Sequence, residues 1–181
     1  GSGSNDAFIL KIDALGDTVW SKEFGGGGSE VGWSIEEAMN GDLLLAGETS
    51  STGAGQSDAW LIRVDNNGNL IWETTLGDTD TDTGRDMAEL SNGNIMFAWN
   101  TIAPGNSYWS TLQSKIDSAT GNEIDNQTFS SPFNYFSHKV ITYTGRSTTL
   151  TVGYNAPGAN LDDMMFFGLD TAGMNYDAVC P

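Results

Sequence analysis

The sequence predicts an all-β protein, and within that class a partial β-propeller of about three and a half four-stranded blades. Three observations support this fold: similarity returns about every 52 residues, each repeat holds four short strand signals, and no segment keeps a 3.6-residue apolar period. A propeller blade has four strands in roughly 40–50 residues. The alternatives fit less well, because β-solenoid coils are usually shorter and a β-sandwich does not require so constant a period.

Aspartate and glycine markers fix the period. The aspartates are 52, 52 and 53 residues apart, and the glycines 52, 53 and 52. These markers are Asp13, Asp65, Asp117 and Asp170, and Gly16, Gly68, Gly121 and Gly173. The repeats cover approximately residues 6–57, 58–109, 110–162 and 163–181, the last being half a repeat. We therefore expect residues 1–181 to form a single propeller segment.

The strands of the first repeat can be assigned in order. We expect them at residues 6–13, 18–24, 32–39 and 42–49. The first is almost continuously apolar, as in a strand covered on both faces. Gly16 suits the turn that follows it, because glycine accepts a positive φ. A Gly-rich loop precedes the third strand, and Asn40-Gly41 predicts a tight hairpin turn before the fourth.

Counting hairpins predicts an incomplete ring. Hairpins of the first and second strands occur four times, and hairpins of the third and fourth occur three times. Two copies of the chain would supply eight hairpins of the first kind and six of the second. One junction would then place two hairpins of the first kind side by side. We therefore expect the rest of a longer propeller, or another chain, to complete the ring. A compact four-bladed ring with one two-stranded blade is the alternative.

The repeated motif is D-A-[FW]-[IL]-[IL]-[KR]-[IV]-D-x-x-G-[DN]-x-[VI]-W, followed by a Gly-rich segment and a hydrophobic-A-G-x-T stretch. It is strong in the first two repeats, where it ends on Trp20 and Trp72, and weaker later, where Asp125 and Asp177 replace the tryptophan. This motif resembles the repeats of secreted bacterial β-propeller proteins of the Bacteroidetes type. The resemblance implies a propeller fold and a location outside the cell or at the cell surface.

Composition limits the partners. The formal net charge is −17, from 24 acidic and 7 basic residues, so phosphate-rich nucleic acids and anionic membranes would be repelled. No apolar run approaches the ~20 residues of a membrane span, so no membrane insertion is expected. The single cysteine, Cys180, permits no internal disulfide.

The segment DTDTDTGRDMAE at residues 78–89 is a candidate calcium loop. Its carboxylates occupy positions 1, 3, 5, 9 and 12, which is the oxygen-ligand spacing of an EF-hand. These residues are Asp78, Asp80, Asp82, Asp86 and Glu89. Position 6 is Thr83, where the EF-hand has glycine. Calcium is the one cofactor suggested, and a solvated acidic turn is the alternative.

Aromatic residues outside the repeat pattern are candidate ligand contacts. Trp33, Trp99, Tyr108 and Trp109 could stack against sugar rings, although packing between blades is the alternative. Trp20 and Trp72 recur with the repeat, so we expect them to be structural. His138 is the only histidine, so we expect no histidine-based zinc site and an ordinary strand or loop position.

No nucleophile or acid–base constellation is visible in the sequence. The prediction is therefore a non-catalytic extracellular propeller module for adhesion, scaffolding or protein recognition, with a protein or a glycan as partner. Two alternatives remain open, because propellers host many activities. One is a carbohydrate-binding propeller. The other is a fragment of a propeller glycosidase or lyase, whose carboxylates would come from different blades.

Overall fold

The computed structural model of the chain confirms the all-β class. It describes residues 3–102, 108–129, 134–142, 148–156 and 163–170. These residues contain thirteen strands and no helix, so none of them forms a helix that could cross a membrane. The strands are β1 (Ala7–Ile12), β2 (Thr18–Phe24), β3 (Glu30–Glu37), β4 (Leu43–Thr49), β5 (Asp58–Val64), β6 (Leu70–Leu76), β7 (Asp82–Glu89), β8 (Ile95–Thr101), β9 (Ser110–Ile116), β10 (Glu123–Phe129), β11 (Asn134–Thr142), β12 (Thr148–Ala156) and β13 (Asp163–Asp170). Cys180 and Asp177 lie outside the described residues.

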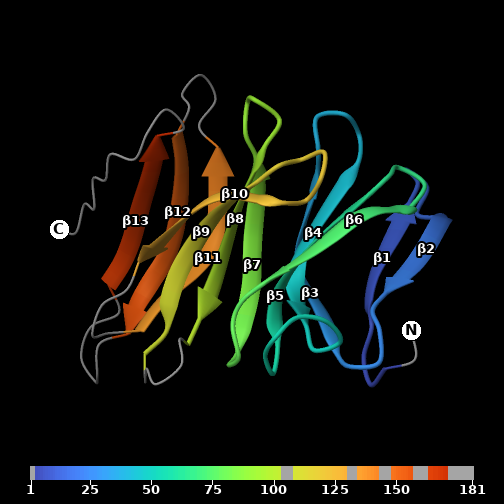
Figure 1. Cartoon of the computed structure of the whole chain (residues 1–181). Coiled ribbons are helices and arrows are strands. Elements are labelled where there is room, and N and C mark those ends of the chain that lie inside the picture. The colour runs from blue at the N-terminus through green and yellow to red at the C-terminus, as the bar shows by residue number, and fades with distance from the viewer. Residues whose placement is uncertain (1–2, 103–107, 130–133, 143–147, 157–162, 171–181) are drawn as a thin grey trace.

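The strands form four antiparallel sheets in chain order. The first has β1 and β2, the second β3 to β6, the third β7 to β10, and the fourth β11 to β13. Figure 1 shows the sheets following one another in a row from β1–β2 to β13. Each four-stranded sheet takes the last two strands of one sequence repeat and the first two of the next. Among the described strands no sheet closes on itself, so the architecture shown is a row of packed antiparallel sheets.

The repeated aspartate and glycine make the turns between the first two strands of each repeat. Asp13 Oδ1 accepts the backbone N–H of Leu15 at 2.8 Å, and Asp65 Oδ1 accepts that of Asn67 at 2.8 Å. Gly68 follows at φ 77°, a conformation that favours glycine. The sequence markers therefore recur because the same turn is built three times, and the third copy is closed by Asp117.

Three apolar cores lie between successive sheets. The first core joins the first and second sheets through Ile9, Leu45, Trp60, Ile62 and Val64. The second core joins the second and third sheets through a larger set: Leu44, Leu61, Trp72, Met87, Ile95, Phe97, Trp99, Leu112 and Ile116. The third core joins the third and fourth sheets through Ala88, Leu90, Met96, Ala98 and Val140. Each four-stranded sheet is thus covered on both faces, which explains the nearly continuous apolar runs.

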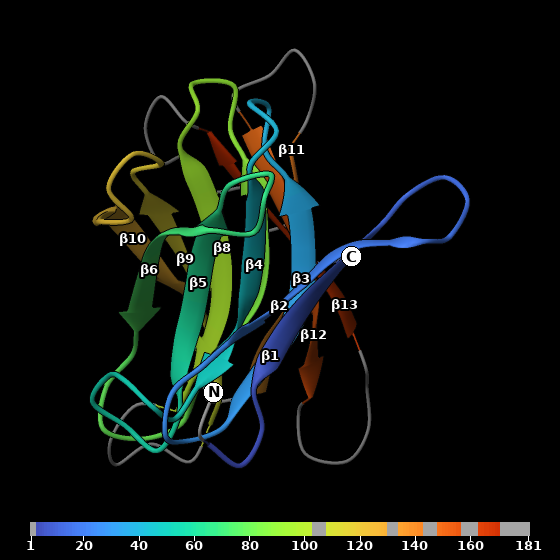
Figure 2. The ribbon, with the colours of Figure 1, turned by 90° about the vertical axis from the view of Figure 1, so that its right-hand side faces the viewer.

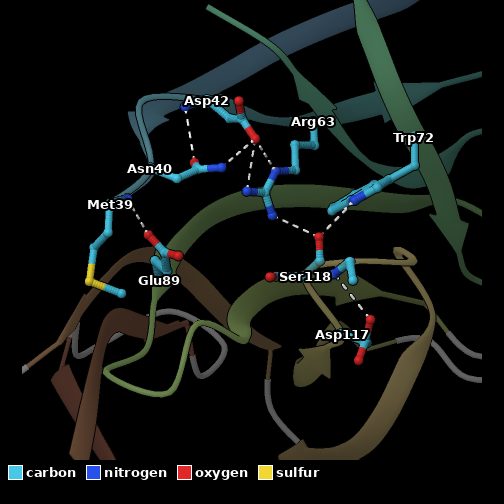
Figure 3. Close-up of polar contacts among 9 residues, drawn as sticks. Met39, Asn40, Asp42, Arg63, Trp72, Glu89, Asp117 and Ser118 are labelled. Carbon is cyan, nitrogen blue, oxygen red and sulfur yellow. Dashed lines mark hydrogen bonds and ion pairs between the residues drawn. The ribbon is translucent and has the colours of Figure 1, made fainter.

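The repeated tryptophans connect neighbouring sheets. Trp20 Nε1 donates to the carbonyl of Asn66 at 3.1 Å, and Trp72 Nε1 donates to the carbonyl of Ser118 at 3.0 Å. The ring of Trp72 lies against Gly121, where a Cβ would come within 2.8 Å of it. Arg63 donates to the same Ser118 carbonyl at 2.7 Å (Figure 3). This arrangement confirms the structural role predicted for the two tryptophans.

Candidate functional site

Three edge strands lie side by side along one side of the molecule. β3, β7 and β11 are each the terminal strand of their sheet, and β7 contacts both of the others. In Figure 2, β3 and β11 are on the right of the molecule, whereas β6 and β10 are on the left. Surface along β3, β7 and β11 is therefore contributed by three sheets and three sequence repeats.

Each of these edge strands has a β-bulge at the same repeat position. The extra residue is Trp33 in β3, Arg85 in β7 and His138 in β11. The spacings between them are 52 and 53 residues, so the three are repeat equivalents with different side chains. A bulge leaves one residue without an opposite partner and re-aims its side chain. We call these three residues the bulge row.

The bulge row forms a connected group. The guanidinium carbon Cζ of Arg85 lies 5.3 Å from the centroid of the Trp33 ring, which is cation–π distance. Trp33 is 51% exposed, and His138 is exposed. Desolvation, together with the charge of Arg85, lowers the pKa of His138, which favours the neutral imidazole. The row therefore combines a flat apolar ring, one permanent positive charge and a neutral imidazole.

Asp86 holds the three bulges in place. Its buried carboxylate accepts the Ser34 hydroxyl of β3, the Val140 backbone N–H of β11 at 2.6 Å and the Lys139 ammonium at 3.1 Å. Asp86 itself belongs to β7, so one side chain joins three sheets beside the bulge row. Such a fully satisfied buried carboxylate is expected to fix the relative position of the strands.

More carboxylates lie further along the same strands. Burial raises the pKa of Glu36, and the negative charges of Asp86 and Glu89 raise it further. A backbone hydrogen bond from Glu89 and the positive charge of Lys139 lower this pKa, but the net shift is upward. Glu89 accepts the backbone N–H of Met39 at 2.5 Å (Figure 3). The edge strands therefore have an acidic part that is separate from the bulge row.

The structure gives the calcium prediction no support. Asp82 Oδ2 accepts the backbone N–H of Asp78 at 2.8 Å, and Asp78 Oδ1 accepts that of Asp80 at 3.0 Å. Asp86 and Glu89 are hydrogen-bonded between strands, as described above. Within the described part of the chain, no group of three or more acidic, histidine or cysteine side chains is placed to hold a metal ion. Four of the five carboxylates, those of Asp78, Asp82, Asp86 and Glu89, accept hydrogen bonds within the loop or between strands.

The four candidate aromatic residues do not form one platform. Trp99 is buried in the second core and donates from Nε1 to Ser114 Oγ at 2.9 Å, so we assign it to packing instead of ligand contact. Tyr108 is exposed, and the Trp109 ring packs 5.5 Å from that of Phe136. Trp33 alone among the four belongs to the bulge row. Sequence reasoning missed Arg85 as a site residue and treated His138 as ordinary, although their shared repeat position with Trp33 was a usable signal.

The first sheet is open where its equivalents are covered. β1 pairs only with β2, whereas β5 pairs with β4 and β9 pairs with β8. Phe8 is 65% exposed and its equivalent Trp60 is 2% exposed; Leu10 is 50% exposed and its equivalent Ile62 is fully buried. Phe8, Leu10 and the equally exposed Ile12 are called the open face. A groove of about 500 Å³ runs between β1 and β3 beside it.

Comparison with known proteins shows the fold alone. No protein family matches the chain, and no curated protein matches it. Among solved structures, the chain is similar to a protein of unknown function from Bacteroides caccae, with a TM-score of 0.55 and 13% sequence identity. The match covers 99% of this chain and 70% of that protein. At this identity the likeness indicates a shared all-β architecture.

Proposed function

We propose that this chain is part of a β-propeller whose role is the non-catalytic recognition of another protein, as an extracellular module for adhesion or scaffolding. A row of sheets that pack face to face, with β3, β7 and β11 along one side and β6 and β10 along the other, is the arrangement expected of successive propeller blades. The partner protein would complete the first sheet, in which β1 pairs only with β2 among the described strands. The acidic surface and the motif resemblance support the extracellular location.

The open face carries this proposal. In the second sheet the equivalents of Phe8, Leu10 and Ile12 pack against the sheet before them. In the third sheet Leu112 and Ile116, at the same repeat positions, do likewise. The first sheet presents the same apolar pattern with no described sheet against it. Contiguous exposed apolar residues of this kind mark interaction surfaces in soluble proteins.

The free edge of β1 specifies what the partner presents. In the second sheet β4 lies along this edge, with Leu45 opposite Ile62 and Ala46 opposite Leu61. Because β1 repeats the sequence of β5, a β-hairpin like β3–β4 is the structure that matches the edge. Addition of a strand supplies main-chain hydrogen bonds, and the apolar side chains supply specificity. The partner is therefore expected to contribute a β-hairpin that resembles residues 30–49.

A synthetic peptide with the sequence of residues 30–57 tests this recognition. We expect it to bind the chain and to slow hydrogen exchange of β1 amides, measured by NMR, because those amides gain hydrogen-bond acceptors. The matched control is the same peptide with Ala46→Pro, which removes a backbone donor from the strand that faces β1. Equal protection by both peptides, or none by either, would contradict the proposal.

Substitutions at one pair of repeat positions separate recognition from folding. Leu10→Lys places a charge on the open face, so we expect loss of peptide binding with a change in unfolding free energy within about 0.5 kcal/mol. Ile62→Lys buries the same charge at the equivalent position, and we expect the chain to unfold. Circular dichroism during urea titration measures the stability of both variants. Strong destabilisation by Leu10→Lys would show that the open face is already covered within the chain.

A further inference from the structure

Arg85 carries a positive charge that no described carboxylate neutralises. Its Nε atom is buried and has no hydrogen-bond partner. Two other cations of the sheets are paired, since Arg63 lies 2.8 Å from Asp42 and Lys139 lies 3.1 Å from Asp86. In a chain with 24 acidic and only 7 basic residues, an arginine left without a carboxylate is notable. Its planar guanidinium is suited to bind a carboxylate through two parallel hydrogen bonds.

Trp33 places an apolar surface directly beside this charge. Half of its side chain is exposed, although the Arg85 guanidinium lies over its ring. Indole rings bind the apolar faces of ring-shaped ligands, and their edges leave room for polar contacts. A ligand that touches both side chains therefore combines a ring with an acidic group attached to it.

The surrounding electrostatics favour a ligand with a single negative charge. The pKa of His138 is lowered, which disfavours a second positive charge beside Arg85. Glu36 follows Trp33 by three residues and Glu89 follows Arg85 by four, which is about 10 and 13 Å along a strand. These carboxylates and the net charge of −17 would oppose a multiply charged phosphate more than a carboxylate.

We propose that the bulge row binds an acidic sugar, with the sugar ring against Trp33 and its carboxylate on the guanidinium of Arg85. Exposed His138 borders the site on the side of β11. Asp86 acts as a positioning residue, because it fixes the three bulged strands relative to one another. The site adjoins the open face, because Trp33 lines the same groove as Phe8 and Leu10, whereas Arg85 does not line that groove.

Calorimetric titration of the whole chain with galacturonic acid, which carries a single carboxylate, tests this site, with the neutral methyl ester of the same sugar as the matched ligand control. We expect the acid to bind about tenfold or more tightly than the ester, because a charge-assisted bidentate contact is lost in the ester. Arg85→Gln should abolish this preference, and Trp33→Ala should weaken both ligands. Lys22→Gln removes an exposed cation outside the row and should change neither affinity.

Several outcomes would overturn the assignment. The first is that the acid does not bind at millimolar concentration. The second is that acid and ester bind with equal affinity. The third is that Lys22→Gln weakens binding as much as Arg85→Gln does. Competition by poly-glutamate as strong as that by galacturonic acid would assign the row to acidic protein segments instead. Thermal unfolding shows whether each variant is folded, and Arg85→Lys serves as a second variant. It keeps the charge without the planar fork, so an affinity between those of the natural chain and Arg85→Gln is expected.

Discussion

Glu30 and Asp82 occupy the same position in successive repeats, yet their carboxyl groups have opposite pKa shifts. Burial raises the pKa of Glu30, but hydrogen bonds from Ser51, Thr49 and Gly26 outweigh it, and the net pKa is lowered. Burial also raises the pKa of Asp82, and its fewer hydrogen bonds do not reverse this. The donor that Asp82 lacks is the equivalent of Ser51, whose position is Ala103 in the next repeat, and the charges of Asp78 and Asp58 raise the pKa of Asp82 further.

Opposite pH dependences follow from these two shifts. Ionised Glu30 contributes stability that is present above its unfolded pKa of about 4.3 and lost as the pH falls through its lower folded value. Asp82 favours the folded state when protonated, so its contribution is present below about 3.9 and lost as the pH rises through its higher folded value. We expect the stability difference between the natural chain and Glu30→Gln to grow with pH, and that for Asp82→Asn to shrink. Urea unfolding from about pH 3 to pH 7 measures both; slopes of the same sign would contradict the assignment.

At the scale of elements, the tryptophan contacts explain how one sheet is fixed on the next. Trp72 is 9% exposed, and its ring fills the space above Gly121 while its Nε1 is bound to Ser118. Trp20 makes the same contacts with Gly68 and Asn66 but is only half-buried, because the sheet it belongs to is open. The same motif residue therefore contributes differently in different sheets.

Replacing these tryptophans should show that difference. We expect Trp72→Ala to lower the free energy of unfolding by about 3–5 kcal/mol, because a buried aromatic ring and its hydrogen bond are both lost. Trp20→Ala should have a smaller effect, since less of its ring is removed from water. Guanidinium unfolding followed by circular dichroism measures both values. An equal loss in the two variants would mean that burial does not decide the strength of this contact.

The strands could be predicted from the sequence, but their grouping into sheets could not. The turn residues Asp65 and Gly68 identify one hairpin, and Asn40-Gly41 identifies another. The two kinds of connection between hairpins, residues 25–29 and 50–57, are both rich in glycine and serine. Nothing in their composition tells which of the two connections crosses between sheets. The predicted repeat of residues 6–57 therefore has the right length, but its boundaries differ from those of the sheet formed by residues 30–76.

The candidate site was harder to predict, because it depends on the strand register. Trp33, Arg85 and His138 share a site because each is the extra residue of a bulge, and the position of a bulge depends on strand pairing that the sequence does not show. Trp99 was proposed as a ligand contact for a different reason. It breaks the repeat at the position of Gly47, which suggested freedom from packing, but its ring fills the core between the second and third sheets.

At the scale of the whole molecule, side-chain hydrogen bonds connect each sheet to its neighbour. Asn100 is one such contact, since its Oδ1 accepts the backbone N–H and the hydroxyl of Ser137 at 2.9 Å each. Asp86 reaches further, because it joins Ser34 of the second sheet to Val140 of the fourth. In stacked structures, stability is approximately a sum of unit and interface terms, so such a residue controls whether the units unfold together.

Asp86→Ala should therefore reduce both stability and cooperativity. The buried N–H of Val140 would lose its acceptor, which alone costs about 1–3 kcal/mol. Because the second and fourth sheets would no longer share hydrogen bonds to one side chain of β7, we expect a broader urea transition with a lower m-value. Asp65→Ala is the matched control, since Asp65 accepts hydrogen bonds only within its own turn among the contacts described. That variant should lose stability while keeping the m-value. An unchanged m-value in Asp86→Ala would instead show that the apolar cores suffice to couple the sheets.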